Sequence, residues 1–143
     1  MKFLLVLTVL TVLLAVAADA PPKVTFVGHE KVADVIAKGG ALVTQADLTV
    51  TGSHRDKTGQ VEIHEKETDV IYIIEGDATF VTGGTAVGTR QTKAGQAVGT
   101  DIKGGETHKL VKGDVIVVPA GIPHWFKEVP KSVNYYVVKV IKP

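Results

Sequence analysis

Residues 113–125 read GDVIVVPAGIPHW and join a turn, an apolar strand and a histidine in one short run. The residues at 115–118 are β-branched and apolar at every position, which predicts a strand buried on both faces. Pro119 ends the ladder of hydrogen bonds, and the residues after it form a turn. We therefore expect a strand that delivers His124 to a fixed place in the fold.

The composition is that of one ordinary globular domain. The chain has 143 residues, 45% of them hydrophobic and 22% charged, which supports a core but leaves no room for a second domain. Its 16 basic and 15 acidic residues are nearly balanced and scattered, so no basic surface predicts binding to nucleic acid or to an anionic membrane. The 15 glycines indicate many tight turns, which favours an all-β fold.

The N-terminal residues have the pattern of a secretory signal peptide. A short positive start precedes an apolar run over 3–16, and small residues follow at 15–20. The alternative is a membrane anchor, which needs about 20 apolar residues, and Asp19 ends this run early. We predict that residues 1–20 are removed on export, so that the mature chain is secreted or periplasmic and keeps no stable membrane anchor. With no cysteine, its fold relies on a core rather than on disulfides.

The rest of the chain alternates apolar stretches with turns. A first strand is expected at 24–27, followed by a helix at 29–38 that Gly39 and Gly40 would end. The other expected elements are a polar loop at 52–59 and strands at 41–51, 60–67, 69–75, 78–81, 98–102, 108–111, 115–118 and 133–141. This pattern predicts a single domain over residues 24–141.

Two ionisable side chains point the same way from one of these strands. Apolar and polar residues alternate over 60–67, so Glu62 and His64 share a face, and Asp69 opens the next strand. Other interpretations stay open at this point. Glu62 could pair with Lys66, Asp69 could be a turn residue, and the histidines could be core residues with satisfied hydrogen bonds.

The spacing around His124 resembles the second motif of the cupin superfamily. That motif, Gly, five residues, Pro, one residue, Gly, two residues, His, is met by Gly113, Pro119, Gly121 and His124. The chain departs at Glu128, where the family often has a structural Asn. The resemblance implies an all-β fold, a single cupin-type double-stranded β-helix (jelly-roll) barrel with a short N-terminal helix.

A second stretch resembles the first cupin motif in spacing but differs in residue type. Six residues separate Asp69 from Gly76, and the preceding pair, two histidines in the family, is Glu62 and His64 here. By this resemblance Glu62, His64, Asp69 and His124 are the candidate metal ligands. Two imidazoles and two carboxylates suit a divalent Mn, Fe, Zn or Ni ion, and a two-His, one-carboxylate set suits iron and oxygen chemistry. Asp is one methylene shorter than the family's Glu, so the spacing alone does not decide whether Asp69 reaches the metal.

Other residues are candidates for a small-molecule pocket near the metal. His54 and Arg55 lie together in a loop expected at the barrel mouth, where they could bind a substrate carboxylate, although such a pair is often only solvated. Strand alternation directs either Trp125 or Phe126 toward the cavity. Tyr72 could line the pocket or pack in the core. We take His54, Arg55, Tyr72 and Trp125 as the candidate substrate-binding residues.

Two classes of function fit these features. One is a metal-dependent enzyme of oxygenase, isomerase or lyase type that acts on a small organic substrate, with Glu62 or Asp69 as general base if it is not a ligand. The other is a non-catalytic extracytoplasmic module that binds a small ligand. The resemblance also implies a homodimer, in which residues 24–27 could add to a neighbour's sheet.

Overall fold

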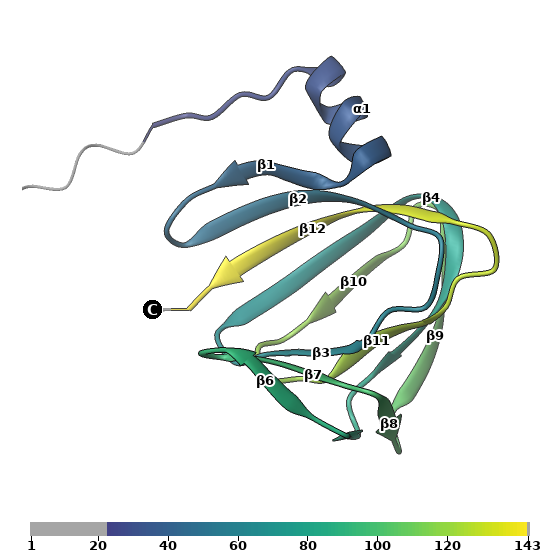
Figure 1. Cartoon of the computed structure of the whole chain (residues 1–143). Coiled ribbons are helices and arrows are strands. Elements are labelled where there is room, and N and C mark those ends of the chain that lie inside the picture. The colour runs from purple at the N-terminus through teal and green to yellow at the C-terminus, as the bar shows by residue number, and fades with distance from the viewer. Residues whose placement is uncertain (1–22, 143) are drawn as a thin grey trace, which may run out of the picture.

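The protein folds into a jelly-roll barrel with one short helix packed outside it (Figure 1). The structure, a computed structural model, describes residues 23–142, so the predicted signal peptide lies outside the described residues. The elements in chain order are α1 (His29–Lys38), β1 (Gly40–Thr44), β2 (Leu48–Arg55), β3 (Val61–His64), β4 (Glu67–Thr82), β5 (Thr85–Val87), β6 (Arg90–Lys93), β7 (Gln96–Gly99), β8 (Asp101–Lys103), β9 (Glu106–Val111), β10 (Val115–Val118), β11 (His124–Glu128) and β12 (Val133–Ile141). The predicted all-β barrel with a short N-terminal helix is confirmed. Among the described residues, no helix is long and apolar enough to cross a membrane.

Strand β4 belongs to both sheets of the barrel. Its first half pairs with β12 and β10, and its second half pairs with β11 and β9. The strand bends at Gly76, where φ is 81° and a Cβ would collide with the carbonyl oxygen of Ser132, so only glycine fits. The two strands predicted at 69–75 and 78–81 are therefore parts of one strand of 16 residues that bends at Gly76.

The two sheets meet along β4 and enclose the core. The first contains β1, β2, β12, β4 and β10, and the second contains β9, β4, β11, β3, β7 and β6. Between them lie the side chains of the main apolar cluster, which are Ile71, Ile73, Ala78, Phe80, Leu110, Val118, Phe126, Val133, Tyr135 and Val137. The ring of Phe126 packs against Phe80 and Tyr135, at centroid distances of 4.6 and 4.7 Å.

Helix α1 covers the outer side of β2. Its one buried residue, Val35, packs with Ile36 over Gly52, where a Cβ would lie 2.9 Å from Val35 Cγ1. The helix ends at Gly39, whose φ of 76° is strained for any other residue. The predicted helix is thus confirmed, and glycine at position 52 is what lets it approach the sheet.

The expectations for residues 24–27 and 115–118 were wrong. Residues 24–27 form no strand, and Val24 and Phe26 are 91% and 89% exposed, because no neighbouring strand in the chain pairs with this segment. Strand β10 is not buried on both faces either. Val115 and Val117 are 59% and 54% exposed, since the outer face of its sheet carries no covering layer at that point.

The predicted polar loop at 52–59 is also shorter than expected, because β2 continues to Arg55. The extension follows from the pairing of β2 with β12, whose register joins Arg55 to Val133. This pairing carries the inner-facing side chains of β2 further along the barrel. It therefore places Arg55 on a barrel strand rather than in the predicted loop.

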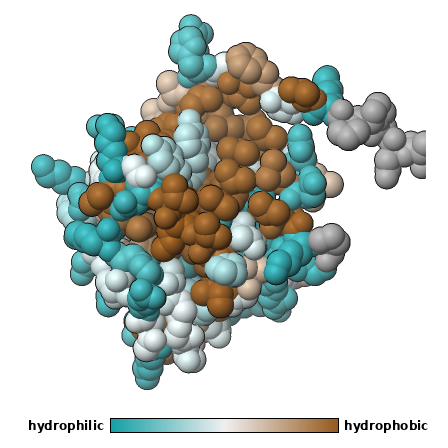
Figure 2. All heavy atoms as spheres, turned by 180° about the vertical axis from the view of Figure 1, so that it is seen from behind, coloured by the Kyte–Doolittle hydropathy of each residue, from teal (hydrophilic) through white to brown (hydrophobic). Residues whose placement is uncertain are grey.

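Apolar side chains gather on the outside of the first sheet. The exposed ones include Tyr72 on β4, Val115 and Val117 on β10 and Val140 on β12. A shallow apolar groove on the same sheet is lined by Thr25, Val27, Leu42, Val43, Val50, Val70, Tyr72, Tyr136 and Val138. Figure 2 shows apolar side chains spread over a broad area of one face of the molecule.

Candidate metal centre and pocket

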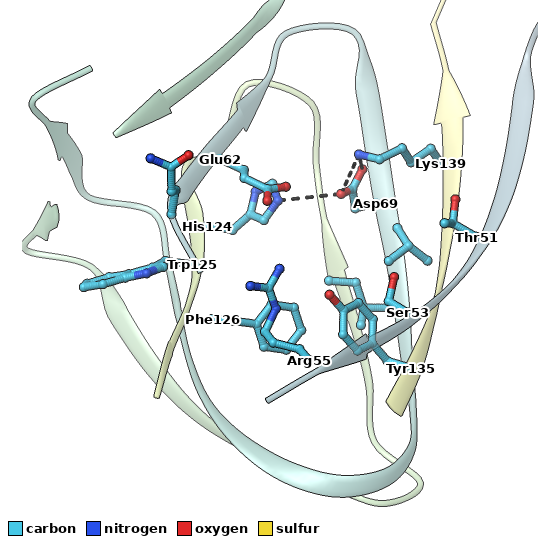
Figure 3. Close-up of a pocket in the computed structure, with 13 residues that line it drawn as sticks. Thr51, Ser53, Arg55, Glu62, Asp69, His124, Trp125, Phe126, Tyr135 and Lys139 are labelled. Carbon is cyan, nitrogen blue, oxygen red and sulfur yellow. Dashed lines mark hydrogen bonds and ion pairs between the residues drawn. The ribbon is translucent and has the colours of Figure 1, made fainter. Parts of the chain in front are cut away.

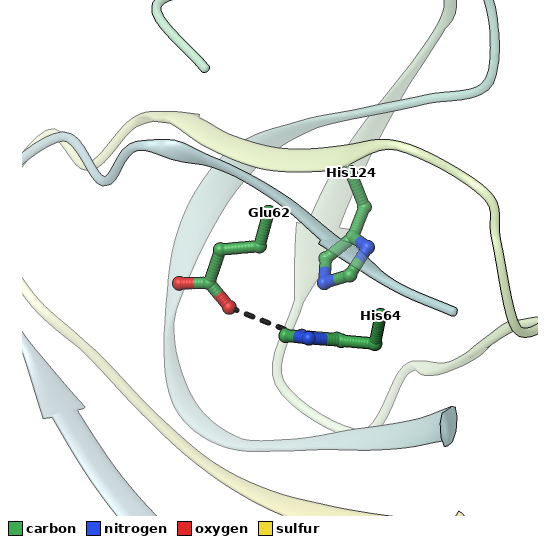
Figure 4. A group of neighbouring side chains, drawn as sticks. All are labelled: Glu62, His64 and His124. Atoms are coloured by element: carbon green, nitrogen blue, oxygen red, sulfur yellow. Dashed lines mark ion pairs between the residues drawn. The ribbon is translucent and has the colours of Figure 1, made fainter. Parts of the chain in front are cut away.

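The candidate ligands come from strands β3, β4 and β11, and Figure 4 draws three of them, Glu62, His64 and His124. Glu62 and His64 lie two residues apart on β3, so strand alternation directs both side chains inward. His124 opens β11, and the register sets its Cα directly opposite Glu62. Ligand atoms of Glu62, His64 and His124 all lie within 4.8 Å of one another.

The turn before β11 fixes the ring of His124. The backbone N–H of Gly121 donates to the carbonyl of His64 at 2.7 Å, which ties this turn to β3. His124 Nδ1 lies 3.1 Å from the carbonyl oxygen of Ile122, and because a carbonyl only accepts, Nδ1 carries the proton. In the neutral ring Nε2 therefore presents its lone pair to the interior.

A chain of hydrogen bonds fixes the ring of His64 in the same way. Gln96 on β7 donates from Nε2 to the Glu67 carboxylate at 2.8 Å, so its Oε1 faces His64 and accepts from Nδ1. His64 Nε2 is then the free atom. It is buried and has no hydrogen-bond partner among the described residues.

The free nitrogen atoms converge on carboxylate oxygens. His64 Nε2 lies 3.4 Å from Glu62 Oε2 and 3.6 Å from Asp69 Oδ2, and His124 Nε2 lies 3.6 Å from the same Asp69 oxygen. These separations suit atoms that share a cation. A buried nitrogen without a partner is costly, and metal coordination would satisfy it, so the residues present fit a divalent metal ion.

Asp69 is also held by a cation of the chain itself. Lys139 on β12 donates to both Asp69 oxygens at 2.9 Å and lies 3.0 Å from Glu67 Oε2. Asp69 is only 3% exposed and lies inside β4, so it is not a turn residue. Its carboxylate therefore stands between the Lys139 ammonium group and the two imidazoles.

The carboxylates favour positive charge at His64. Burial alone would lower the pKa of His64, but the neighbouring Glu62 and Asp69 carboxylates raise it above its ordinary value. Contact with His64 holds the pKa of Glu62 below its ordinary value, and the charge of Arg55 acts in the same direction. Burial lowers the pKa of His124. A metal cation would experience the same attraction to these carboxylates.

A cavity of about 210 Å³ adjoins these residues (Figure 3). Its lining comes from both sheets and comprises Thr51, Ser53, Arg55, Gln60, Glu62, Asp69, Ile71, His124, Trp125, Phe126, Tyr135, Val137 and Lys139. The polar residues gather near the candidate ligands and along β2, while Phe126, Ile71 and Val137 supply apolar walls. The site can therefore hold a small molecule next to a metal ion.

The structure divides the four candidate substrate-binding residues. Arg55 and Trp125 line the cavity, and the Trp125 indole N–H donates to the carbonyl of Gly59 at 2.7 Å. His54 is exposed and its ring bonds Asn134 at 2.6 Å, because successive residues of a strand face opposite sides and Arg55 takes the inner one. Tyr72 faces outward for the same reason, three residues along β4 from the inner-facing Asp69, so it neither lines this cavity nor packs in the core.

Three polar residues that contact the candidate ligands were not anticipated. Lys139 stands on the inner face of β12 in step with Tyr135 and Val137, so counting by two along that strand would have found it. Glu67 precedes Asp69 by two residues, which the same rule places on one face. Gln96 carries no such signal, since its contact with His64 spans 32 residues.

Comparison with known families decides the relationship that the motifs suggested. Residues 35–143 match the sequence profile of the cupin family. The chain belongs to the cupin family. No curated protein matches this cupin. The matched residues include all four candidate ligands and nearly the whole barrel.

Solved structures share the fold of this cupin at low sequence identity. A protein from Bacillus halodurans, BH2720, superposes with a TM-score of 0.58 and 19% identity, covering 87% of this chain and 86% of its own. The conserved SPY1581 protein of unknown function from Streptococcus pyogenes gives 0.51 and 24% over 73% of each chain. DMSP lyase DddQ from Ruegeria pomeroyi gives 0.50 and 15% over 71% of this chain and 45% of its own. These likenesses show the fold alone.

Proposed function

We propose that this cupin binds one divalent metal ion, Mn, Fe, Zn or Ni, through Glu62, His64 and His124 and acts as an enzyme on a small organic molecule in the adjoining cavity. One observation carries the proposal. Two imidazoles are fixed by hydrogen bonds at Nδ1, so that both Nε2 atoms converge on carboxylates inside the barrel. Such partners at the second nitrogen orient the imidazoles that bind metals in proteins.

Each part of the cavity has a role in this proposal. A bound metal ion would polarise a carbonyl group or bind oxygen, which fits an oxygenase, isomerase or lyase type of reaction. Asp69, which is fourth in the predicted ligand set, faces the same nitrogen atoms but is held by Lys139. Its place beside both Nε2 atoms makes it the candidate for a fourth ligand, or for the group that accepts a proton from the substrate once its ion pair with Lys139 opens.

The alternative is a non-catalytic module that binds a small ligand. The Lys139 pairing favours this alternative, because the ammonium group already contacts the carboxylates of both Asp69 and Glu67. If Glu62 binds the metal, no unpaired carboxylate of the cavity lining is left to act as a base. Binding without turnover is then the expected behaviour.

Metal addition and turnover test the proposal in two steps. Protein stripped with a chelator receives Mn, Fe, Zn or Ni in turn, and at least one ion should raise the melting temperature, because a ligand that binds only the folded state stabilises it. The loaded protein is then incubated with a panel of small organic molecules, and consumption is followed by NMR. Stabilisation without turnover supports the binding module, and stabilisation by none of the ions contradicts the metal site.

We also propose that the chain is exported and acts outside the cytoplasm. The support is the N-terminal pattern of a positive start, an apolar run and small residues. N-terminal sequencing of secreted or periplasmic material should give a start between Ala18 and Pro21. Recovery of an intact Met1 from the membrane fraction would contradict this.

We propose further that the domain forms a homodimer through the outer face of its first sheet. Its support is the exposed apolar set at Tyr72, Val115, Val117 and Val140, together with the unpaired residues 24–27 beside the groove. A contiguous apolar patch on the surface of a protein often marks a site of interaction with another protein.

A further inference from the structure

Arg55 holds a cationic group inside the cavity in a fixed position. It ends β2, and its guanidinium carbon lies 5.2 Å from the centre of the Phe126 ring. On another side it packs against the backbone of Gly59, where a Cβ would lie 2.7 Å from Nη1. Figure 3 shows the guanidinium group pointing into the cavity, toward Glu62 and His124. A ring and a backbone segment thus fix the position of the group, and its terminal nitrogen atoms face the cavity.

This guanidinium group has no anionic partner within the described part of the chain. No carboxylate of those residues lies within ion-pair distance of it, and its Nε is buried without a hydrogen-bond acceptor. Lys139, the other cation of the cavity, is already paired with Asp69 and Glu67. Buried charges and hydrogen-bond donors are normally paired. Arg55 has no such partner among the described residues, so a bound ligand would supply the acceptor.

The surroundings of Arg55 indicate what would supply that acceptor. A guanidinium fork matches a carboxylate with two parallel hydrogen bonds. Ser53 and Thr51 line the cavity from the same strand, and Ile71 and Val137 provide apolar wall. The volume of about 210 Å³ lies below the range of roughly 300–1,000 Å³ of drug-sized pockets, so the ligand is small.

We infer that the cavity takes a small organic carboxylate, with its carboxylate group on Arg55 and the remainder of the molecule directed toward Glu62 and His124. The inference rests on the proposed function only for what lies at that far end, because the contact with Arg55 needs no metal. It names the class of substrate or ligand as a short-chain organic acid rather than a neutral sugar or alcohol. Of the pair predicted to bind a carboxylate, only Arg55 has this role, because the ring of His54 is exposed and hydrogen-bonded to Asn134.

The side-chain NMR signals of arginine test this directly, because the chain has two arginines, Arg55 and Arg90. Metal-stripped protein labelled with ¹⁵N is titrated with propionate and lactate, and with propionamide and lactamide as uncharged matches. The Nε–H signal of Arg55, assigned with the R55K variant, should shift and saturate with an acid but not with its amide. The signal of the exposed Arg90 should stay in place. R55K should bind the acids at least about tenfold more weakly, while H54A should bind them like wild type.

Two outcomes would overturn the inference. One is an Arg55 signal that moves with neither acid, and the other is equal movement of both arginine signals with either acid and with sodium chloride. Repeating the titration on zinc-loaded protein separates this inference from the proposed function. Zinc bound without an Arg55 response rejects the carboxylate ligand alone. An Arg55 response in protein that binds none of the four metals supports the inference and rejects the metal site.

Discussion

The ammonium group of Lys139 lies 2.9 Å from both carboxylate oxygens of Asp69. One of those oxygens also faces the Nε2 atoms of His64 and His124 at 3.6 Å. A residue that the motif spacing predicts as a metal ligand is therefore part of an internal ion pair. This arrangement leaves Glu62 as the carboxylate that is free of lysine and beside both imidazoles.

Removing Lys139 should destabilise the fold, because it leaves two carboxylates without their cation. The Lys139→Met variant should lose about 3–5 kcal/mol of unfolding free energy in chelator, since Asp69 is almost fully buried. Urea unfolding measures this. The Lys109→Met control removes an exposed pair with Asp77 and should cost no more than about 1 kcal/mol. Equal losses in the two variants would show that the Lys139 pair is not a buried ion pair in solution.

In the metal-free protein, the ionised Glu67 should raise the free energy of unfolding, and this contribution should be lost at acid pH. Burial alone would raise its pKa, but Lys139 outweighs burial and holds the pKa below the ordinary value of 4.5. The unfolded chain then binds the proton more tightly, so this contribution is complete above pH 4.5 and is lost as the pH falls below it. In chelator, wild type should lose stability more steeply than Glu67→Gln between about pH 5 and pH 3. Identical slopes in urea unfolding would refute this assignment.

Gln96 should control metal affinity without touching the metal. Its Oε1 accepts a hydrogen bond from His64 Nδ1, and its Nε2 donates one to the Glu67 carboxylate. Gln96→Ala therefore releases the imidazole from its orientation. Loss of such an orienting partner typically weakens metal binding about 10–100-fold. Titration of stripped protein with zinc measures the affinity, and the exposed Gln91→Ala on β6 is the control. Wild-type affinity in Gln96→Ala would mean that the turn and strand alone orient His64.

A dimer through the outer face of the first sheet should respond to charge placed there. The Val117→Lys variant puts an ammonium group on the exposed side of β10, and removal of residues 1–27 takes away the segment beside the groove. Both changes should weaken association in light scattering, because each removes apolar area from the proposed contact. Thr107→Lys, on the other sheet, should leave the mass unchanged. A monomer mass for wild type at all concentrations would rule the dimer out.

The sequence was sufficient to predict the candidate ligands that local strand and turn patterns place in the site. It did not predict the residues, distant in the chain, that contact those ligands. Alternation by two along β3 placed Glu62 and His64 on one face, and the turn after Pro119 brought His124 opposite them. The contacts of Asp69 with Lys139 and of His64 with Gln96 join residues 70 and 32 positions apart. They depend on how strands pair across the barrel, which the spacing of one motif does not determine.

The errors in the fold arise where the structure depends on which strands pair with and cover a segment, which local sequence patterns do not determine. A run of apolar residues such as 115–118 indicates a strand, but whether both faces are buried depends on what covers the sheet. Here the outer face of β10 is open, and the unpaired segment 24–27 lies exposed. The sequence predicts separate strands at 69–75 and 78–81, because glycine at positive φ serves a turn and a bend equally well. Only the pairing of β4 in both sheets shows that the chain bends there within one strand.

Metal analysis of protein purified without chelator tests the central claim most directly. Wild type should carry close to one divalent ion per chain, and His64→Ala and His124→Ala should each carry far less. His29→Ala, which changes an exposed histidine at the start of α1, should retain the wild-type content. The two site variants should melt lower than wild type only when metal is supplied. A wild type that carries no metal and takes up none of the four ions, with both variants melting several degrees lower in chelator, would contradict the account and make these histidines core hydrogen-bonding residues.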